Sequence, residues 1–395
     1  MFKYLLDITS IKLSKSSIVY FLLIFVPLAV ILELVHTGQI VLFVVAALGL
    51  IPLAKLIGDS TEHLAAYYGA TLGSLLNVTF GNAAEIIIGV VSINAGLLDL
   101  VKASITGAIL GNILLIFGLS IIAGGLKYKE QLFNRENTGV QSSMLFLAVI
   151  GLAVPTVLAA TTLKPVDMNN QIKIQFLSDS LAFLLLAVYI SGIIFTVFTH
   201  KHLFFAQPAA EVETEVEGQK RLSLGRKGTD GEGQAEGEWN HERWGKKKSF
   251  VLLGISMAGV VIVSEILVGS VEATTREFGF GELFVGAIII GIVGNAAEHT
   301  SAIILARKGK IDLSIGIAAG SGTQIALFVV PILVIAGIII GKPVTLVFTI
   351  FELVSIFLAA IILNLIAHDG KSNWFEGLML TVVYIIIAIG FFFIS

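Results

Sequence analysis

Two glutamates lie inside strongly apolar segments of the chain. Glu85 and Glu298 each end the same pentapeptide, Gly-Asn-Ala-Ala-Glu, which occurs at 81–85 and again at 294–298. An ionised side chain at the centre of a membrane-spanning helix costs about 2.5–3.5 kcal/mol on insertion scales, so such residues are functional by default. No Lys or Arg is expected near the middle of a span to pair with them. The sequence therefore predicts an intramembrane site built on two carboxylates.

The neighbours of these glutamates suit a hard divalent cation. Ca2+ takes 6–8 oxygen ligands from carboxylates, amides, backbone carbonyls and water. Asn82 and Asn295 precede the glutamates by three residues, which predicts a shared helix face. Gly81 and Gly294 loosen the helix, so nearby carbonyls can turn toward an ion. With no cysteine in the chain, thiolate ligands are excluded.

The remaining candidates are polar residues in or near apolar segments, and each also suits a structural role. They are Ser321 and Gln324 as further ligands, Asn112 and Thr323 as ligands or helix–helix hydrogen bonders, Glu265 as a proton relay, Glu62 and Glu282 as an acidic funnel, and His299 as a proton carrier. His299 directly follows Glu298, so its helical direction differs by about 100°.

Two carboxylates in one low-dielectric cavity predict ion exchange. The empty site carries two negative charges, and either one Ca2+ or two protons cancel them. Burial and mutual repulsion favour protonation of the vacant site, and a bound metal reverses that preference. If only a neutralised site changes its exposure, about two protons exchange for each Ca2+. The ions are transported substrates, and no cofactor is expected.

The composition requires a membrane. Of 395 residues, 56% are hydrophobic and 13% are charged, against about 25% charged residues in soluble domains. The net charge of −3 does not suggest nucleic acid as a partner. A spanning helix needs about 20 mostly apolar residues, and eleven segments qualify: 16–35, 39–58, 68–95, 101–124, 140–160, 176–199, 249–270, 281–306, 313–340, 343–367 and 373–394.

The chain repeats itself with a displacement of 213 residues. Besides the pentapeptide, this offset pairs Gly96 with Gly309 and Asp99 with Asp312. Because each unit has an odd number of helices, the two units are inverted, as in secondary transporters with a midplane site. We expect an all-α polytopic membrane protein with an extra N-terminal helix and two inverted five-helix repeats. The expected divisions are 1–38, a first repeat at 39–199, a flexible cytoplasmic linker at 200–248 and a second repeat at 249–395.

Basic residues predict the orientation. Twenty of the 25 Lys and Arg residues fall on the side of the N-terminus, and five on the other side. Basic loops stay in the cytoplasm, so the N-terminus is expected there and the C-terminus opposite. The short N-terminus favours a prokaryotic cell membrane. The sequence leaves the oligomeric state open between a monomer and a homo-oligomer.

These motifs resemble the cation/proton exchanger (CAX) family of the calcium/cation antiporter superfamily. The resemblance rests on GNAAEIIIGVVSINAGLLDLVKASITGAILGN from Gly81, GNAAEHTSAIILARKGKIDLSIGIAAGSGTQIALF from Gly294, SEILVGSVEAT from Ser264 and DGKSNWFEG from Asp369. It implies eleven helices, Ca2+ bound by the two motif glutamates, and alternating access by sliding of the first helix of each repeat. Ala108, Gly291 and Thr323 depart from residues frequent in the family, which affects the exact coordination.

Other functions are less consistent with the sequence. A Na+/Ca2+ exchanger or an antiporter for Mn2+ shares the paired-glutamate design, but the segment at Gln324 is more similar to the proton-coupled branch. An intramembrane hydrolase would need paired aspartates, and no Asp lies near the centre of an expected span. A channel would not need inverted repeats with titratable glutamates. We therefore expect a transporter rather than an enzyme.

Overall fold

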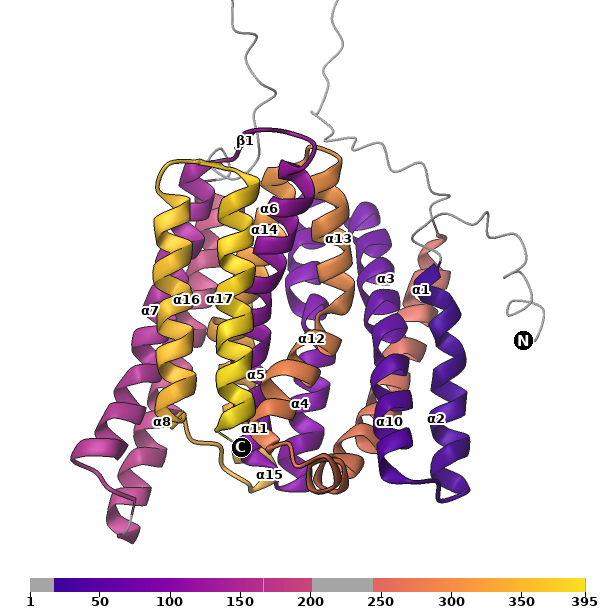
Figure 1. Cartoon of the computed structure of the whole chain (residues 1–395), viewed down its shortest axis with the longest axis vertical. Coiled ribbons are helices and arrows are strands. Elements are labelled where there is room, and N and C mark those ends of the chain that lie inside the picture. The colour runs from indigo at the N-terminus through magenta and orange to yellow at the C-terminus, as the bar shows by residue number, and fades with distance from the viewer. Residues whose placement is uncertain (1–17, 166, 201–243, 395) are drawn as a thin grey trace, which may run out of the picture.

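The computed structural model describes residues 18–165, 167–200 and 244–394, and these form a bundle of helices with one short two-stranded ribbon (Figure 1). Most of the predicted linker and the first 17 residues lie outside the described part. The first half contains α1 (Ile18–Phe21), η4 (Leu22–Ile24), α2 (Phe25–Leu34), α3 (Gln39–Gly81), α4 (Ala83–Ala95), α5 (Leu98–Leu110), η5 (Gly111–Ile116), α6 (Phe117–Gly125), β1 (Gln131–Leu132), α7 (Arg135–Thr161), α8 (Met168–Ile193) and η6 (Ile194–Thr199).

The second half follows the same helical pattern. It contains α10 (Lys246–Phe278), α11 (Glu282–Phe284), η7 (Val285–Ile290), α12 (Gly291–Gly294), α13 (Ala296–Arg307), α14 (Ile311–Gln324), η8 (Ile325–Val329), α15 (Val330–Ile340), α16 (Ile350–Ala367), β2 (Lys371–Ser372) and α17 (Trp374–Phe393). The elements η5, η6, η7 and η8 are π-helices, and η4 is a 3-10 helix.

The chain is an all-helical polytopic membrane protein. Nine helices in the described residues are long and apolar enough to span a bilayer, and Glu282–Gly294 with Ala296–Arg307 makes a tenth if this bent pair is one span. The first predicted span, 16–35, corresponds to a shorter apolar helix, Val19–Leu34. The described part thus contains nine or ten candidate spans, where the sequence predicted eleven.

The long helix α3 contains a fold-back. It holds the span Gln39–Tyr68 and the start of the next one, Leu75–Ala95. A Cβ built on Gly73 would lie 2.8 Å from the Cβ of Ala65, although residues eight apart in a straight helix are about 12 Å apart. The chain therefore turns back between the two spans, and the close approach requires glycine at position 73.

Lys55 corrects two expectations. The predicted span 39–58 ends ten residues too early, because the helix continues to Tyr68. Lys55 therefore lies near the middle of a span, where the sequence predicted no basic residue. Its side chain is only 13% exposed and pairs with Asp59 one turn later, at 3.0 Å. Paired charges of this kind do not end a helix, which is why composition alone placed the boundary wrongly.

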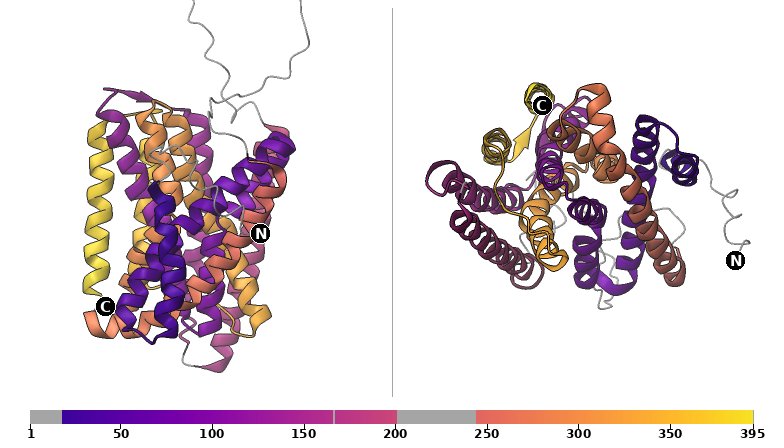
Figure 2. Two further views of the ribbon diagram at one scale, coloured as in Figure 1. Left: turned by 90° about the vertical axis from the view of Figure 1, so that its right-hand side faces the viewer. Right: turned by 90° about the horizontal axis from the view of Figure 1, so that it is seen from below.

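The buried apolar side chains form two separate clusters. One joins α2, the first span of α3, the start of α4 and α10, and includes Leu42, Leu53 and Val260. The other joins α5 to α8 with α13 to α17, and includes Ile109 and Ala319. Figure 2 shows α2 at the edge of the bundle beside α3 and α10. The helices α2, α10 and the first span of α3 contribute to the first cluster alone and are called the smaller body. The remaining helices are called the larger body, and among them α4, α5 and η7 contribute to both clusters.

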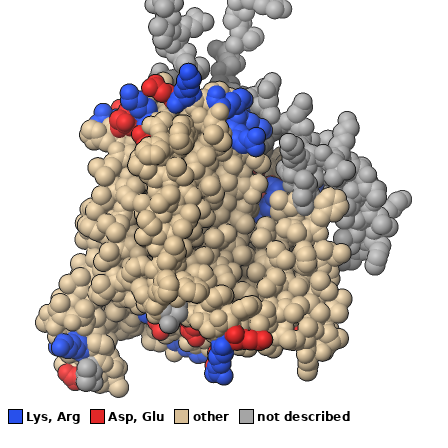
Figure 3. Space-filling model, viewed as in Figure 1, with Lys and Arg blue, Asp and Glu red and all other residues tan. Residues whose placement is uncertain are grey.

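Charged side chains gather at the two ends of the bundle, with an apolar band between them on the face shown in Figure 3. At one end, β1 pairs with β2 in antiparallel register, Gln131 opposite Ser372, and the Asn134 N–H donates to Asp312. At the other end, the Lys342 ammonium donates to the carbonyl of Asn94. Loops that the sequence assigns to opposite sides of a membrane lie at opposite ends.

Candidate ion-binding site

Both halves of the molecule break a helix at the asparagine of the repeated motif. Asn82 separates α3 from α4 and has φ −97° and ψ 20°, and Asn295 separates α12 from α13 with φ −96° and ψ 6°. The second break bends the chain by 59°. Gly and Asn have low helix propensity, and asparagine competes with the backbone for hydrogen bonds. The predicted shared face of Asn and Glu on one continuous helix is therefore wrong, because each Asn lies in the break.

Each break starts a new helix with its glutamate in the first turn. Glu85 lies in the first turn of α4, and Glu298 in the first turn of α13. The helix dipole favours negative charge at these positions. In each carboxylate, Oε2 is buried and has no hydrogen-bond partner among the described residues.

The two motifs face each other across the bundle. A Cβ built on Gly294 would lie 3.4 Å from Oε1 of Glu85, and one built on Gly81 would lie 3.8 Å from Oε1 of Glu298. Each glutamate therefore packs against the glycine of the other repeat. This reciprocity is what an inverted duplication produces when its halves meet at one site.

Amide side chains connect the two breaks to the following helices. Asn82 Nδ2 donates to Oε1 of Gln324 at 2.8 Å, and Asn112 Nδ2 donates to Oδ1 of Asn295 at 3.0 Å. Asn295 in turn donates to the carbonyl of Gly291 at 3.1 Å. Ser321 interacts with the Glu298 carboxylate. Four predicted ligands and Asn112 thus make three side-chain contacts around the glutamates, and these residues together with Glu85 and Glu298 are called the glutamate network.

A π-helix marks the same point in each half. Asn112 lies in η5, and Gln324 is the last residue before η8. Single π-helical turns occur frequently at functional sites because they redirect side chains from the regular helical face. Here they bring Asn112 and Gln324 to the broken helices. Gln324 and Asn112 occupy positions offset by one residue between the repeats.

Four buried oxygens at this site have no hydrogen-bond partner within the described residues. They are Asn82 Oδ1, Glu85 Oε2, Asn112 Oδ1 and Glu298 Oε2. Buried acceptors are normally paired, so this group requires an explanation. Two carboxylate and two amide oxygens are the ligand types of a hard cation, which completes its shell with carbonyls and water.

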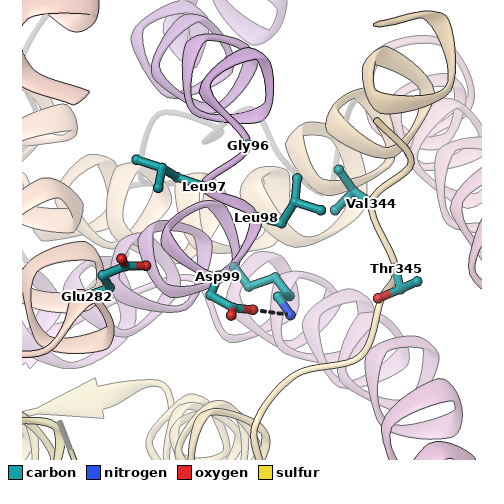
Figure 4. Close-up of a pocket in the computed structure, with 8 residues that line it drawn as sticks. Gly96, Leu97, Leu98, Asp99, Glu282, Val344 and Thr345 are labelled. Carbon is teal, nitrogen blue, oxygen red and sulfur yellow. Dashed lines mark ion pairs between the residues drawn. The ribbon is translucent and has the colours of Figure 1, made fainter. Parts of the chain in front are cut away.

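A small cavity of about 20 Å3 lies beside Glu85. Its walls are mostly apolar and come from α4, α5, α12, η7, η8 and α15: Ile88, Ile105, Ala108, Ile290, Ile325, Val329 and Leu333, with Ser104, Gly291, Gly294 and Asn295. A larger open pocket of about 480 Å3 lies at the end of the bundle where Asp99 pairs with Lys102 at 2.7 Å, and Glu282 stands on the facing wall (Figure 4). The pocket in Figure 4 contains no residue of the glutamate network.

Several predicted residues lie outside this network. Glu265 is exposed on α10, Glu62 is exposed on α3, and Glu282 begins α11 at the far end. His299 is buried, and its Nε2 has no partner among the described residues. Thr323 donates to the carbonyls of Gln141 and Ala319, which is the helix–helix role that the sequence left open.

Asn77 is a polar residue near the site that the sequence reasoning did not single out. A Cβ built on Gly81 would lie 3.9 Å from Asn77 Oδ1 and 3.8 Å from Oε1 of Glu298. Asn77 is exposed, so its amide lies on the accessible side of this glutamate. The signal was a polar residue one helical turn before the motif glycine, inside an apolar segment.

An apolar multispan bundle with paired internal carboxylates defines a membrane transporter of the ion-exchanger class. Residues 38–202 and 248–393 match the family model described as "Sodium/calcium exchanger protein". The chain therefore belongs to this family, and it is not an enzyme. This confirms the superfamily expected from the paired motifs.

Individual relatives match nearly the whole chain. The Ca(2+)/H(+) antiporter of Aphanothece halophytica is 40% identical over 382 residues, covering 96% of this chain and 98% of the relative. The Ca(2+)/H(+) antiporter ChaA of Bacillus subtilis (strain 168) is 40% identical over 371 residues, covering 93% and 96%.

Solved structures share the fold. The structure of native YfkE has a TM-score of 0.76 at 37% identity and covers 95% of this chain and 99% of its own. The structure of the H+/Ca2+ exchanger CAX has a TM-score of 0.66 at 16% identity, over 95% and 92%. The second comparison shows a common fold alone.

Proposed function

We propose that this protein exchanges Ca2+ for H+ across a membrane, with Glu85 and Glu298 binding either ion. The observation that carries the proposal is the group of four unpartnered buried oxygens, two of them from these glutamates. The names of the full-length relatives support the same pair of ions. Asn82, Asn295, Ser321, Gln324 and Asn112 are proposed to complete or position the ligand shell.

Charge cancellation couples the two ions. The carboxylates are close enough to repel each other, and both are surrounded by protein rather than bulk water. Repulsion and low dielectric make the doubly charged empty site unfavourable. A Ca2+ ion cancels both charges, as do two protons. Calcium binding therefore releases protons, and protonation releases calcium.

The separate packing of the smaller body supports alternating access. The smaller body contains the first span of α3 and α10, which lie in corresponding positions of the two repeats. The helix breaks at Asn82 and Asn295 sit where the bodies meet, and broken helices at the midplane are typical of carriers. We infer that the smaller body slides against the larger one and exposes the site to one end at a time.

The proposal includes a membrane topology. Eleven spans, counting Val19–Leu34, would give two inverted five-helix repeats after one extra helix. The excess of basic residues in the loops at the end with β1 and β2 supports a cytoplasmic position for that end and the opposite side for the C-terminus. The membrane is inferred to be a prokaryotic cell membrane, given the bacterial relatives.

A proton-relay role for Glu265 and the funnel role for Glu62 and Glu282 remain proposals for residues outside the network.

Na+/Ca2+ exchange is the second candidate, because the family is named for it and the fold is shared with a sodium–calcium exchanger at a TM-score of 0.52 and 16% identity. That likeness concerns the fold alone.

Transport by proteoliposomes tests the function. With acid inside and sodium-free buffer, we expect Ca2+ uptake driven by the pH gradient, with Mn2+ tested in parallel. Glu85→Gln and Glu298→Gln should each reduce uptake by about 100-fold or more, since metal ligands are more critical than their supporting shell. Glu277→Gln, an exposed carboxylate at the end of α10, is the matched control. Uptake that depends on a sodium gradient and ignores the pH gradient would overturn proton exchange in favour of sodium.

A further inference from the structure

A cluster of charged and polar side chains joins the N-terminal helix to α3. The Tyr20 hydroxyl, on α1, donates to the Asp59 carboxylate on α3. The Lys55 ammonium pairs with the same carboxylate at 3.0 Å and lies 5.7 Å from the centroid of the Tyr20 ring. Asp59 therefore has one partner on its own helix and another on a different helix.

This cluster is costly in its position. Lys55 and Asp59 lie within the span Gln39–Tyr68, and their side chains are 13% and 27% exposed. Charged groups that are largely removed from water are costly unless they are paired and hydrogen-bonded. A Lys four residues before an Asp is the less favourable order for an intrahelical pair. The stability of the Lys55–Asp59 pair alone therefore does not explain why these charges are buried. The third residue, Tyr20, adds a link between two helices.

The N-terminal helix packs on the smaller body. Ala29 of α2 is fully buried and belongs to the same apolar cluster as Leu53 of α3 and Val260 of α10. A Cβ built on Gly49 of α3 would lie 3.5 Å from Val26 Cγ2 and 3.5 Å from the backbone of Phe25. No residue of α2 belongs to the larger cluster in the described part of the chain.

We propose that the N-terminal helix travels with α3 and α10 as one rigid body, and that Tyr20, Lys55 and Asp59 are positioning residues that couple it to α3. This inference rests on the proposed exchange by sliding of the smaller body. Packed apolar surfaces alone allow helices to slip past one another, because they are not directional. A hydroxyl–carboxylate–ammonium cluster fixes the register between α1 and α3, since any slip leaves a largely buried charge with fewer partners.

A disulfide between α2 and α3 tests the rigid body. The chain has no cysteine, so Val26→Cys with Gly49→Cys introduces a single pair within disulfide reach. Exchange by the oxidised, cross-linked protein should stay within about twofold of the reduced form, because a rigid body needs no internal motion. A block on oxidation, reversed by reductant, would overturn the proposal.

The cluster is tested in the same background. Tyr20→Phe should lower the maximal rate about threefold to tenfold, with the half-saturating Ca2+ concentration unchanged. Forming the 26–49 disulfide in the Tyr20→Phe protein should restore the rate, because the covalent link replaces the lost coupling. An unchanged rate in Tyr20→Phe, or no recovery on oxidation, would refute the coupling role. If the reduced double-cysteine protein exchanged a different ion, the proposed function would fail. The rates of the oxidised and reduced proteins would then be compared with that ion, and this comparison would still decide whether the N-terminal helix moves with α3.

Discussion

At the residue scale, the site depends on how closely two backbones approach two carboxylates. Gly294 lies against Glu85, and Gly81 against Glu298, with no side chain between them. The open space beside each carboxylate leaves its oxygens accessible to an ion and to neighbouring carbonyls. The glycines are therefore as much part of the site as the glutamates.

The glycine contacts make a graded prediction. Gly294→Ala places a methyl group 3.4 Å from Oε1 of Glu85, which the fold tolerates but an ion does not. The Ca2+ concentration for half-maximal uptake should rise about tenfold. Gly81→Ala should have a smaller effect, because its methyl group is 3.8 Å from Glu298.

The control is Gly316→Ala on α14, where a Cβ would meet no atom within 4 Å. Its calcium dependence should match that of the unmodified protein. Calcium dependence in Gly294→Ala that also matches the unmodified protein would mean that Gly294 does not border the bound ion.

The repeat explains which site residues were predictable. Glu85 and Glu298 were found because identical motifs recur at one offset. Asn77 was missed because its counterpart at that offset is Ile290, so the repeat does not mark it. The shared face of Asn82 and Glu85 was wrongly predicted because a sequence pattern assumes a continuous helix, whereas the structure breaks it between them.

At the element scale, the site is held by a close crossing of α5 with η7 and α12. A Cβ built on Gly107 would lie 1.9 Å from the carbonyl oxygen of Ala287, and one built on Gly291 would lie 2.7 Å from the carbonyl carbon of Gly107. Backbones touch here, as small residues allow in membrane bundles. The crossing fixes α12, and hence the break at Asn295, against the helix that carries Asn112.

Gly107→Ala should therefore destabilise the protein. The added methyl group cannot move away from a backbone carbonyl, and overpacking of this kind costs about 1–3 kcal/mol or more. A lower melting temperature in detergent is expected. Gly111→Ala, on the next turn of the same segment and with no atom within 4 Å of its Cβ, should melt like the unmodified protein. Equal melting temperatures for both variants would contradict the crossing.

The sequence predicted that the spanning helices exist, but it did not predict where each of them ends. Runs of about 20 apolar residues predicted the spans well because a bilayer imposes that length. The first span of α3 was cut short at 58 because Lys55, Asp59 and Glu62 made its end look polar. Lys55 and Asp59 pair one turn apart on the same helix, but the further contact of Asp59 with Tyr20, 39 residues earlier, leaves no local signal. The π-helices likewise depend on tertiary packing.

At the scale of the whole molecule, a smaller and a larger body meet at a pair of broken helices, and α4, α5 and η7 contribute to the apolar clusters of both. The smaller body contains α2, the first span of α3 and α10, and the larger body contains the helices that hold Asn112, Ser321 and Gln324. The glutamates lie at the junction, so motion between the bodies must alter the site. Charge cancellation then decides when that motion is allowed.

The most direct test of the central claim is the number of protons released when the purified protein binds Ca2+. Calorimetry in buffers of different ionisation enthalpy measures this number. We predict about two protons released per Ca2+ bound at a pH where both carboxyl groups are protonated. Glu85→Gln and Glu298→Gln should each abolish detectable binding. A Glu85→Gln protein that binds Ca2+ with unchanged affinity and unchanged proton release would contradict the account.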